Sequence, residues 1–150
     1  MSSVGLGTKL RKLIDMLDRD VEAAYCASDL DYRPRFTPVV RALDEGGPQT
    51  IKSLAATALV SHSALSQTIS QMLARRLIVV ESGADARERL ISLSEAGLAL
   101  VPLLRRHWDA THAAVEDLEA DVGVSLTRVV DEALAALERK PFLARMPPLQ

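Results

Sequence analysis

The stretch that decides the fold is residues 50–94, TIKSLAATALVSHSALSQTISQMLARRLIVVESGADARERLISLS. Thr50 and Ser61 are residue types that favour helix N-caps, and each precedes a run of helix-forming residues with apolar side chains at helical spacing. Only residues 58–60 separate the two helices, and the second extends to about Arg76. This pattern predicts two helices joined by a very short turn.

The hydrophobic period changes directly after the second helix. Residues 77–80 are predicted to form a buried strand, residues 83–88 a charged turn, and residues 90–94 a returning strand, because β-branched and apolar residues flank a polar, glycine-containing segment. We therefore expect a β-hairpin immediately after the pair of helices.

Helices are also predicted on both sides of this stretch. An apolar stripe predicts an amphipathic helix over residues 9–27, and Thr37 and Pro38 are expected to cap and start a short helix that ends at the glycines 46–47. A long helix is expected from Ser94, with a kink at its proline, and a last helix follows an N-cap at residue 125.

Composition and charge permit several classes of protein and exclude a few. The chain has 150 residues, which suits one domain, and its aromatic content of 3% with abundant alanine and leucine favours helices. No apolar run is long enough to span a bilayer, and the single cysteine, Cys26, suits a reducing compartment, so we expect a cytoplasmic protein. The net charge is −2, and only residues 49–99 carry a positive excess, which permits nucleic-acid binding without arguing for it.

The helix over residues 61–76 has two different sides. At about 100° per residue, one side is apolar and the other is short and polar. The apolar side comprises Leu65, Ile69, Met72 and Leu73, and the opposite side comprises Ser63, Gln67, Ser70 and Ala74. Serine and glutamine approach a base edge closely and both donate and accept hydrogen bonds, whereas a simple solvent-facing helix usually carries Glu and Lys. The pattern indicates a helix that contacts the DNA major groove.

The hairpin turn adds a charged tip with Asp85, Arg87, Glu88 and Arg89. An arginine on a projecting tip is placed to contact a phosphate or the minor groove, although charged turns are also common for solubility alone. Its position after the polar helix favours the DNA-contacting interpretation.

These residues together resemble a known family. The matching pairs and single residues are Leu54-Ala55, Val60-Ser61, Ser66-Gln67, Asp85-Ala86-Arg87, Leu93-Ser94 and Gly97, which are similar to the signature of MarR-type winged helix-turn-helix regulators. The spacing from Asp85 and Arg87 to Leu93-Ser94 and Gly97 is the most specific part. Two departures stand out, since Leu59 occupies a turn position where relatives often have glycine, and Ser94 replaces the usual threonine. A leucine at positive φ would be strained.

The resemblance implies a mainly α (α+β) fold of order ααα-α-ββ-αα, in which residues 1–150 form a single domain with a winged helix-turn-helix lobe at 37–97. It also implies a helical dimerisation region at 8–30 and 98–145. The DNA contacts are then expected from the recognition helix (Ser61, His62, Ser63, Ser66, Gln67, Ser70 and Gln71) and from the wing (Asp85, Arg87 and Arg89). The apolar stripes of the terminal helices independently require a partner.

A homodimeric, sequence-specific DNA-binding regulator is therefore the expected function, with double-stranded DNA and a second copy of the chain as partners. A repressor on a palindromic operator, released by a small aromatic or anionic ligand, is the finer expectation. Its candidate pocket residues are Tyr25, Tyr32, Arg33, Phe36, His107 and Trp108, although most of them equally suit a core. A ligand-insensitive DNA binder and a winged-helix protein-interaction module remain alternatives.

Other chemistry finds little support in the sequence. His107 and His112 are rotated about 140° apart on one helix and do not share a metal easily, so no metal is expected. No set of nucleophile, base and carboxylate indicates catalysis, so we expect neither an enzyme nor a cofactor. Cys26 is more consistent with an inert thiol than with a redox sensor.

Overall fold

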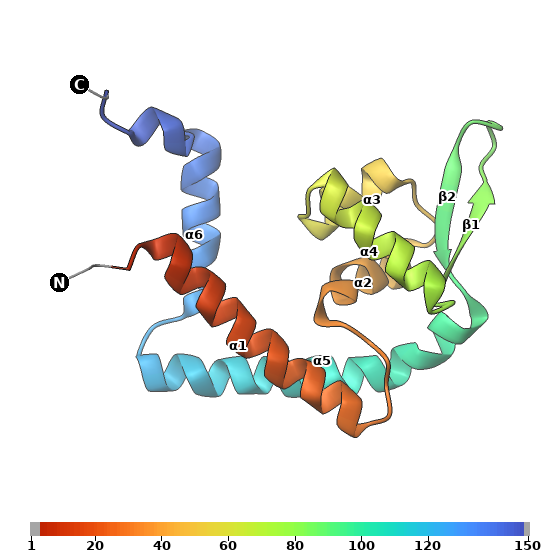
Figure 1. The fold of residues 1–150 in the computed structure, drawn as a ribbon, viewed down its shortest axis with the longest axis horizontal. Helices are drawn as coiled ribbons and strands as arrows, with labels where there is room; N and C mark the ends of the chain where they lie inside the picture. Colours follow the sequence, from red (N-terminus) through yellow and green to blue (C-terminus); the bar gives the residue numbers. More distant parts are fainter. Residues whose placement is uncertain (1–3, 149–150) are drawn as a thin grey trace. The chain divides into compact units, whose positions relative to one another are not determined.

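The computed structural model describes residues 4–148 of the chain. It is mainly helical with one two-stranded antiparallel sheet, and its order of elements is the predicted ααα-α-ββ-αα with two added 3-10 turns (Figure 1). The elements are α1 (Leu6–Ala27), η1 (Pro34–Phe36), α2 (Thr37–Gly46), α3 (Ile51–Ala58), α4 (His62–Ala74), β1 (Ile78–Ser82), β2 (Arg89–Leu93), α5 (Glu95–Val122), α6 (Leu126–Arg139) and η2 (Phe142–Arg145). The predicted fold class is confirmed.

Two compact units make up the chain, Met1–His107 and Trp108–Gln150, and each is described by itself. In the first unit the buried apolar side chains come from the end of α1, from the segment that runs on to α4, from the base of the hairpin and from the first part of α5. The most enclosed of them are Tyr25, Phe36, Val39, Val40, Leu54, Leu65, Met72, Ile91 and Leu104. None of the helices in the described part of the chain is long and apolar enough to cross a membrane.

Most of the predicted helix caps are present. Thr50 accepts a hydrogen bond from the Ser53 amide at 3.2 Å, and Ser61 accepts one from the Ala64 amide at 3.3 Å. The predicted cap at Thr37 is wrong. Because η1 runs directly into α2, the residue before α2 is already helical, and Thr37 lies in the first turn with its hydroxyl 3.2 Å from the Tyr32 hydroxyl.

The hairpin pairs β1 with β2 in antiparallel register, from Ile78 opposite Leu93 to Ser82 opposite Arg89. The prediction of a buried first strand is wrong beyond its base. Val79 and Val80 are 39% and 37% exposed, because a sheet of two strands has no layer to cover it once it projects from the core.

Hydrogen bonds connect the base of the hairpin to the start of α5, at a site that we call the junction. Ser94 accepts a hydrogen bond from the Gly97 amide at 3.0 Å, as an N-cap does, and its hydroxyl donates to the Arg76 carbonyl oxygen at 2.6 Å. A Cβ on Gly97 would lie 2.2 Å from the Leu77 carbonyl oxygen, so only glycine fits at this position. The junction therefore ties the end of α4, the hairpin and the start of α5 to one another.

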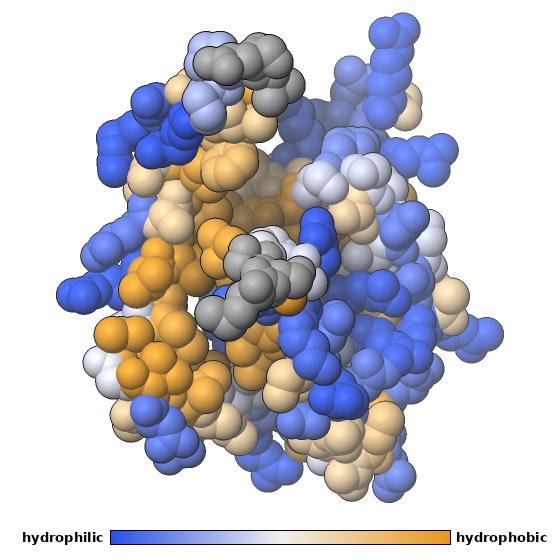
Figure 2. All heavy atoms as spheres, turned by 60° about the vertical axis from the view of Figure 1, so that its left-hand side comes forward, coloured by the Kyte–Doolittle hydropathy of each residue, from blue (hydrophilic) through white to orange (hydrophobic). Residues whose placement is uncertain are grey.

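The terminal helices expose their apolar stripes. On α1, Leu10, Ile14 and Leu17 are 43%, 54% and 41% exposed. In the second unit α6 buries no residue, and its Val130 and Leu134 are each 49% exposed. Figure 2, a view that brings the left-hand side of Figure 1 forward, shows apolar side chains exposed at the surface.

The turn between α5 and α6 belongs to the second unit. Ser125 caps α6 by accepting from the Arg128 amide at 3.2 Å. The Glu119 carboxylate accepts from the Thr127 amide at 2.8 Å and from its hydroxyl at 2.9 Å, and these hydrogen bonds lower the pKa of Glu119.

The helix α5 continues through Pro102 without interruption.

Candidate nucleic-acid interface

The helices α3 and α4 form a helix-turn-helix with a very short connection. Its first residue, Leu59, has φ 55° and ψ 35° and is 84% exposed. Leu59 therefore has the positive φ that would be strained for a leucine, as the sequence departure at this position suggested. A left-handed residue reverses the chain within the three residues between the helices, and here a leucine takes that strained conformation.

The helix α4 packs on its lobe through one narrow stripe. Leu65, Thr68, Ile69 and Met72 are buried, at the spacing of one helical face. The predicted apolar side included Leu73, which is instead 40% exposed, while Thr68 takes the fourth buried place. The buried stripe is thus rotated by a fraction of a turn from the one expected.

The opposite side of α4 is short, uncharged and accessible, as predicted. Ser63, Ser66, Gln67 and Ser70 are exposed there, and we call these four residues the polar face. Ser66 donates to the His62 carbonyl oxygen at 3.0 Å, which leaves its hydroxyl oxygen able to accept. In the described part of the chain the Gln67 and Ser70 side chains form no hydrogen bond. The predicted contacts Ser61 and His62 are also exposed, at the start of the helix.

One predicted recognition residue lies differently. Gln71 is half-buried, and its Oε1 atom is fully enclosed within the lobe. Its carbonyl oxygen accepts a hydrogen bond from the Arg75 Nη1 atom at 3.3 Å. Gln71 therefore lies at the edge of α4 that meets the rest of the lobe, and we do not count it in the polar face.

The wing tip is held in shape by backbone bonds. Asp85 accepts from the Arg87 amide through Oδ1 at 3.1 Å, and the Glu88 amide donates to the Asp85 carbonyl oxygen at 2.9 Å. Asp85 thus steadies the turn that carries Arg87 by binding its backbone, and no ion pair joins the two side chains. Arg87 and Arg89 are both exposed on the projecting hairpin.

Two further cations of the lobe were not predicted as site residues. Lys52 is exposed in the first turn of α3, and Arg76 is exposed at φ 57° between α4 and the hairpin. Among the described residues, neither they nor the wing arginines pair with a carboxylate, whereas Arg75 does. A sequence signal was available, since neither Lys52 nor Arg76 has an acidic residue three or four positions away.

The six candidate pocket residues do not share either of the cavities found among the described residues. Tyr25, Tyr32 and Phe36 are almost fully buried and stack edge to face, with ring centroids 4.8 Å and 5.5 Å apart, and burial raises the pKa of Tyr32. His107 lies against Tyr25 at 4.9 Å and contacts the Ser28 hydroxyl at 3.0 Å. Trp108 is buried and belongs to the second unit.

A hollow of about 310 Å³ lies beside these rings, and only two of the six candidates line it. Its lining residues are Glu22, Cys26, Asp29, Leu30, Asp31, Tyr32 and Arg33. Three carboxylates face one guanidinium there, and Arg33 is already paired with Glu22. The lining charge therefore does not favour an anion.

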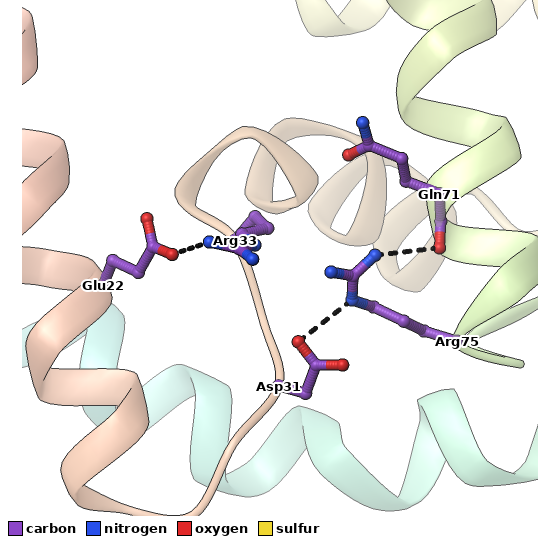
Figure 3. A network of polar contacts seen from close by, with 5 residues as sticks. All are labelled: Glu22, Asp31, Arg33, Gln71 and Arg75. Atoms are coloured by element: carbon purple, nitrogen blue, oxygen red, sulfur yellow. Dashed lines mark hydrogen bonds and ion pairs between the residues drawn. The ribbon is translucent and has the colours of Figure 1, made fainter.

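A polar network links this region to the end of α4. Figure 3 shows Arg33 pointing to Glu22 of α1, and Asp31 pointing to Arg75 at the end of α4. The Arg75 Nε atom is 3.1 Å from the Asp31 carboxylate, and the guanidinium lies 5.3 Å from the centroid of the Phe36 ring.

A helix-turn-helix followed at once by a two-stranded hairpin defines a winged helix-turn-helix protein. Residues 37–88 match the model of the MarR family. The resemblance to MarR-type winged helix-turn-helix regulators that the sequence indicates is therefore confirmed over these residues. No curated protein matches the chain closely enough to name a relative.

Solved structures of transcription regulators share the fold over most of the chain. The M. tuberculosis regulator MosR, in complex with DNA, is 23% identical with a TM-score of 0.71 and covers 95% of this chain and 100% of its own. BpsR from Bordetella bronchiseptica, whose structure is described in terms of the regulation of its DNA binding by 6-hydroxynicotinic acid, is 19% identical with a TM-score of 0.58. The match covers 82% of this chain and 96% of BpsR. A mutant of E. coli MarR is 18% identical with a TM-score of 0.59, and the match covers 89% of this chain and 99% of the MarR chain.

Proposed function

We propose that the chain is a homodimeric, sequence-specific DNA-binding transcription regulator that does no catalysis. The observation that carries the proposal is the polar face of α4, which is exposed, uncharged and built from short side chains on a helix whose opposite side is buried. Such a helix fits a major groove about 12 Å wide, where serine and glutamine contact base edges directly. The exposed wing arginine Arg87 contacts the DNA backbone or minor groove beside it.

The dimer follows from the exposed apolar stripes. Leucine, isoleucine and valine side chains on α1 and α6 remain about half exposed in the single chain, and an isolated soluble chain seldom leaves two such stripes uncovered. A second copy carries the same stripes, and a two-fold interface covers both sets at once. Two copies of α4 then contact two half-sites of a palindrome, spaced about 34–36 Å apart.

Repression by covering a promoter, with release by a small aromatic molecule, is the finer part of the proposal. Its support is the fold shared with a regulator whose structure is described with a hydroxylated aromatic acid. The hollow beside the buried rings, which Cys26, Leu30 and Tyr32 line in part, provides some apolar surface for such a molecule. The carboxylates of the hollow argue for a neutral aromatic rather than an anion.

The first experiment selects duplexes from a random library with the purified protein, and then measures the affinity of the enriched duplex against salt. We expect a palindromic sequence and an affinity that falls steeply with salt. Arg87→Ala should weaken binding to all sequences and reduce the salt slope by about one, whereas Gln67→Ala should change the base preference at one position of each half-site.

The matched control for these variants is Arg106→Ala, which removes an exposed arginine of α5 outside the lobe of residues 37–97 and should leave the base preference unchanged. Enrichment of no sequence, with salt-independent capture of a protein partner instead, would favour the protein-interaction module and contradict the proposal.

A further inference from the structure

One side chain at the end of the recognition helix reaches beyond the buried stripe to a segment before the lobe. That side chain is Arg75, which follows the last residue of α4 and is only 22% exposed. It reaches the segment between α1 and η1, residues 28–33, which we call the connector. The other contacts of α4 come from its buried stripe, from Gln71 and from the junction at its end, and Arg75 adds a restraint on its rotation from the edge of that stripe.

Arg75 makes three contacts that together fix its direction. Its Nε atom is 3.1 Å from Asp31 Oδ1, its Nη1 atom donates to the Gln71 carbonyl oxygen at 3.3 Å, and its guanidinium lies over the Phe36 ring at 5.3 Å. Phe36 is fully buried, so the ring is a fixed platform. The Nε–H group is not aligned for a hydrogen bond to Asp31, so the pair is a close charge contact, and the planar guanidinium is restricted in orientation by that contact and by the ring together.

The side chains that follow Asp31 in the connector are themselves held in place. Tyr32 is 2% exposed and packs between the rings of Tyr25 and Phe36. Arg33, the next residue, pairs with Glu22 of α1. Asp31 is therefore presented to Arg75 by a segment whose neighbouring side chains are held by the core and by α1.

We propose that Arg75 is a positioning residue for DNA recognition, which acts through its pair with Asp31 to fix the rotation of α4 and with it the direction of the polar face. Neither residue contacts DNA in this account. The inference rests on the proposed DNA-binding function and assigns part of its specificity to a carboxylate on the connector.

The sign of one substitution separates positioning from plain electrostatics. Asp31→Asn removes a negative charge that lies against the DNA-binding lobe, and charge alone would then strengthen binding to a polyanion. Positioning predicts the opposite, because the pair that orients α4 is lost. Asp29→Asn is the matched control: it makes the same charge change two residues away, the Asp29 carboxylate forms no ion pair among the described residues, and asparagine tolerates its φ of 56°.

The probe is the duplex that the wild-type protein enriches from a random library. Asp31→Asn should bind it about three- to tenfold more weakly and with an altered base preference, as expected for loss of one partly exposed charged pair that aligns several contacts. Asp29→Asn should bind it at least as tightly as wild type. Asp31→Glu, which keeps the carboxylate, should restore most of the affinity.

Two further measurements test the mechanism. In an Arg75→Gln background, Asp31→Asn should have no additional effect, since the pair is already absent. The salt dependence of DNA binding by Arg75→Gln should have the same slope as that of wild type, because Arg75 does not contact a phosphate. A slope reduced by about one would make Arg75 a direct phosphate contact and would overturn the inference.

The same experiments distinguish failure of the DNA-binding function from failure of the positioning role. If the wild-type protein enriches no duplex, the proposed function is contradicted and this inference falls with it. If the wild-type protein enriches a duplex but Asp31→Asn binds it as tightly as Asp29→Asn does, only the positioning role of Arg75 is overturned.

Discussion

Replacing Leu59 by glycine should stabilise the protein, although it removes a large apolar side chain. Leu59 lies in the left-handed region at φ 55°, which costs an L-residue with a Cβ about 1–2 kcal/mol. Its side chain is 84% exposed, so truncation loses little burial. Glycine makes the unfolded chain more flexible, which costs about 0.4–1 kcal/mol. The balance is a gain of about 0.5–1 kcal/mol, or a rise in Tm of about 2 °C.

The control is Leu59→Ala, which removes the same outer carbons and keeps the Cβ that causes the strain. Urea unfolding at one fixed protein concentration measures both variants, because the midpoint of a dimer depends on concentration. Leu59→Gly should unfold at a higher urea midpoint than Leu59→Ala, with equal slopes. A glycine variant no more stable than the alanine variant would refute the strain assigned to this turn.

Three further predictions concern the junction and the second unit. Gly97→Ala should destabilise the protein by about 1–3 kcal/mol in urea unfolding, because its Cβ would lie 2.2 Å from the Leu77 carbonyl oxygen. Ser94→Ala should cost about 1–2 kcal/mol in the same assay, while Ser94→Thr keeps both hydrogen bonds and should cost much less; equal losses would contradict the double role of the hydroxyl. The lowered pKa of Glu119 gives stability that is present above its usual pKa of 4.5 and is lost as pH falls through the lower folded value. Glu119→Gln, which weakens acceptance from Thr127, should therefore lose less Tm than wild type on acidification, and an identical acid loss in both would be inconsistent with that assignment.

Local chemistry made much of the fold predictable. Thr50, Ser61 and Ser125 cap the helices that their side chains predict, since a cap depends only on the next three residues. The polar side of α4 was likewise visible, because helical spacing separates it from the apolar stripe. Leu59 at positive φ was foreseeable from the shortness of the turn.

The features that depend on distant neighbours were not predictable from the sequence. The exposure of Val79 and Val80 depends on whether anything covers the hairpin, and their β-branched side chains suit a buried or an exposed strand equally. Thr68 is buried where Leu73 was expected to be, and this depends on how α4 packs against the rest of its lobe. The pair of Arg75 with Asp31 joins residues 44 positions apart (75 − 31), which no local pattern reports.

Contact of the polar face of α4 with base edges in the major groove is tested most directly by chemical modification of the DNA. Methylation of guanine N7 marks that groove alone, and interference with binding is measured at each guanine of the enriched duplex. The account predicts that methylation blocks binding at guanines in two segments about one helical turn apart, and that Gln67→Ala relieves the block at one position in each. Binding that is indifferent to N7 methylation throughout the duplex would contradict it.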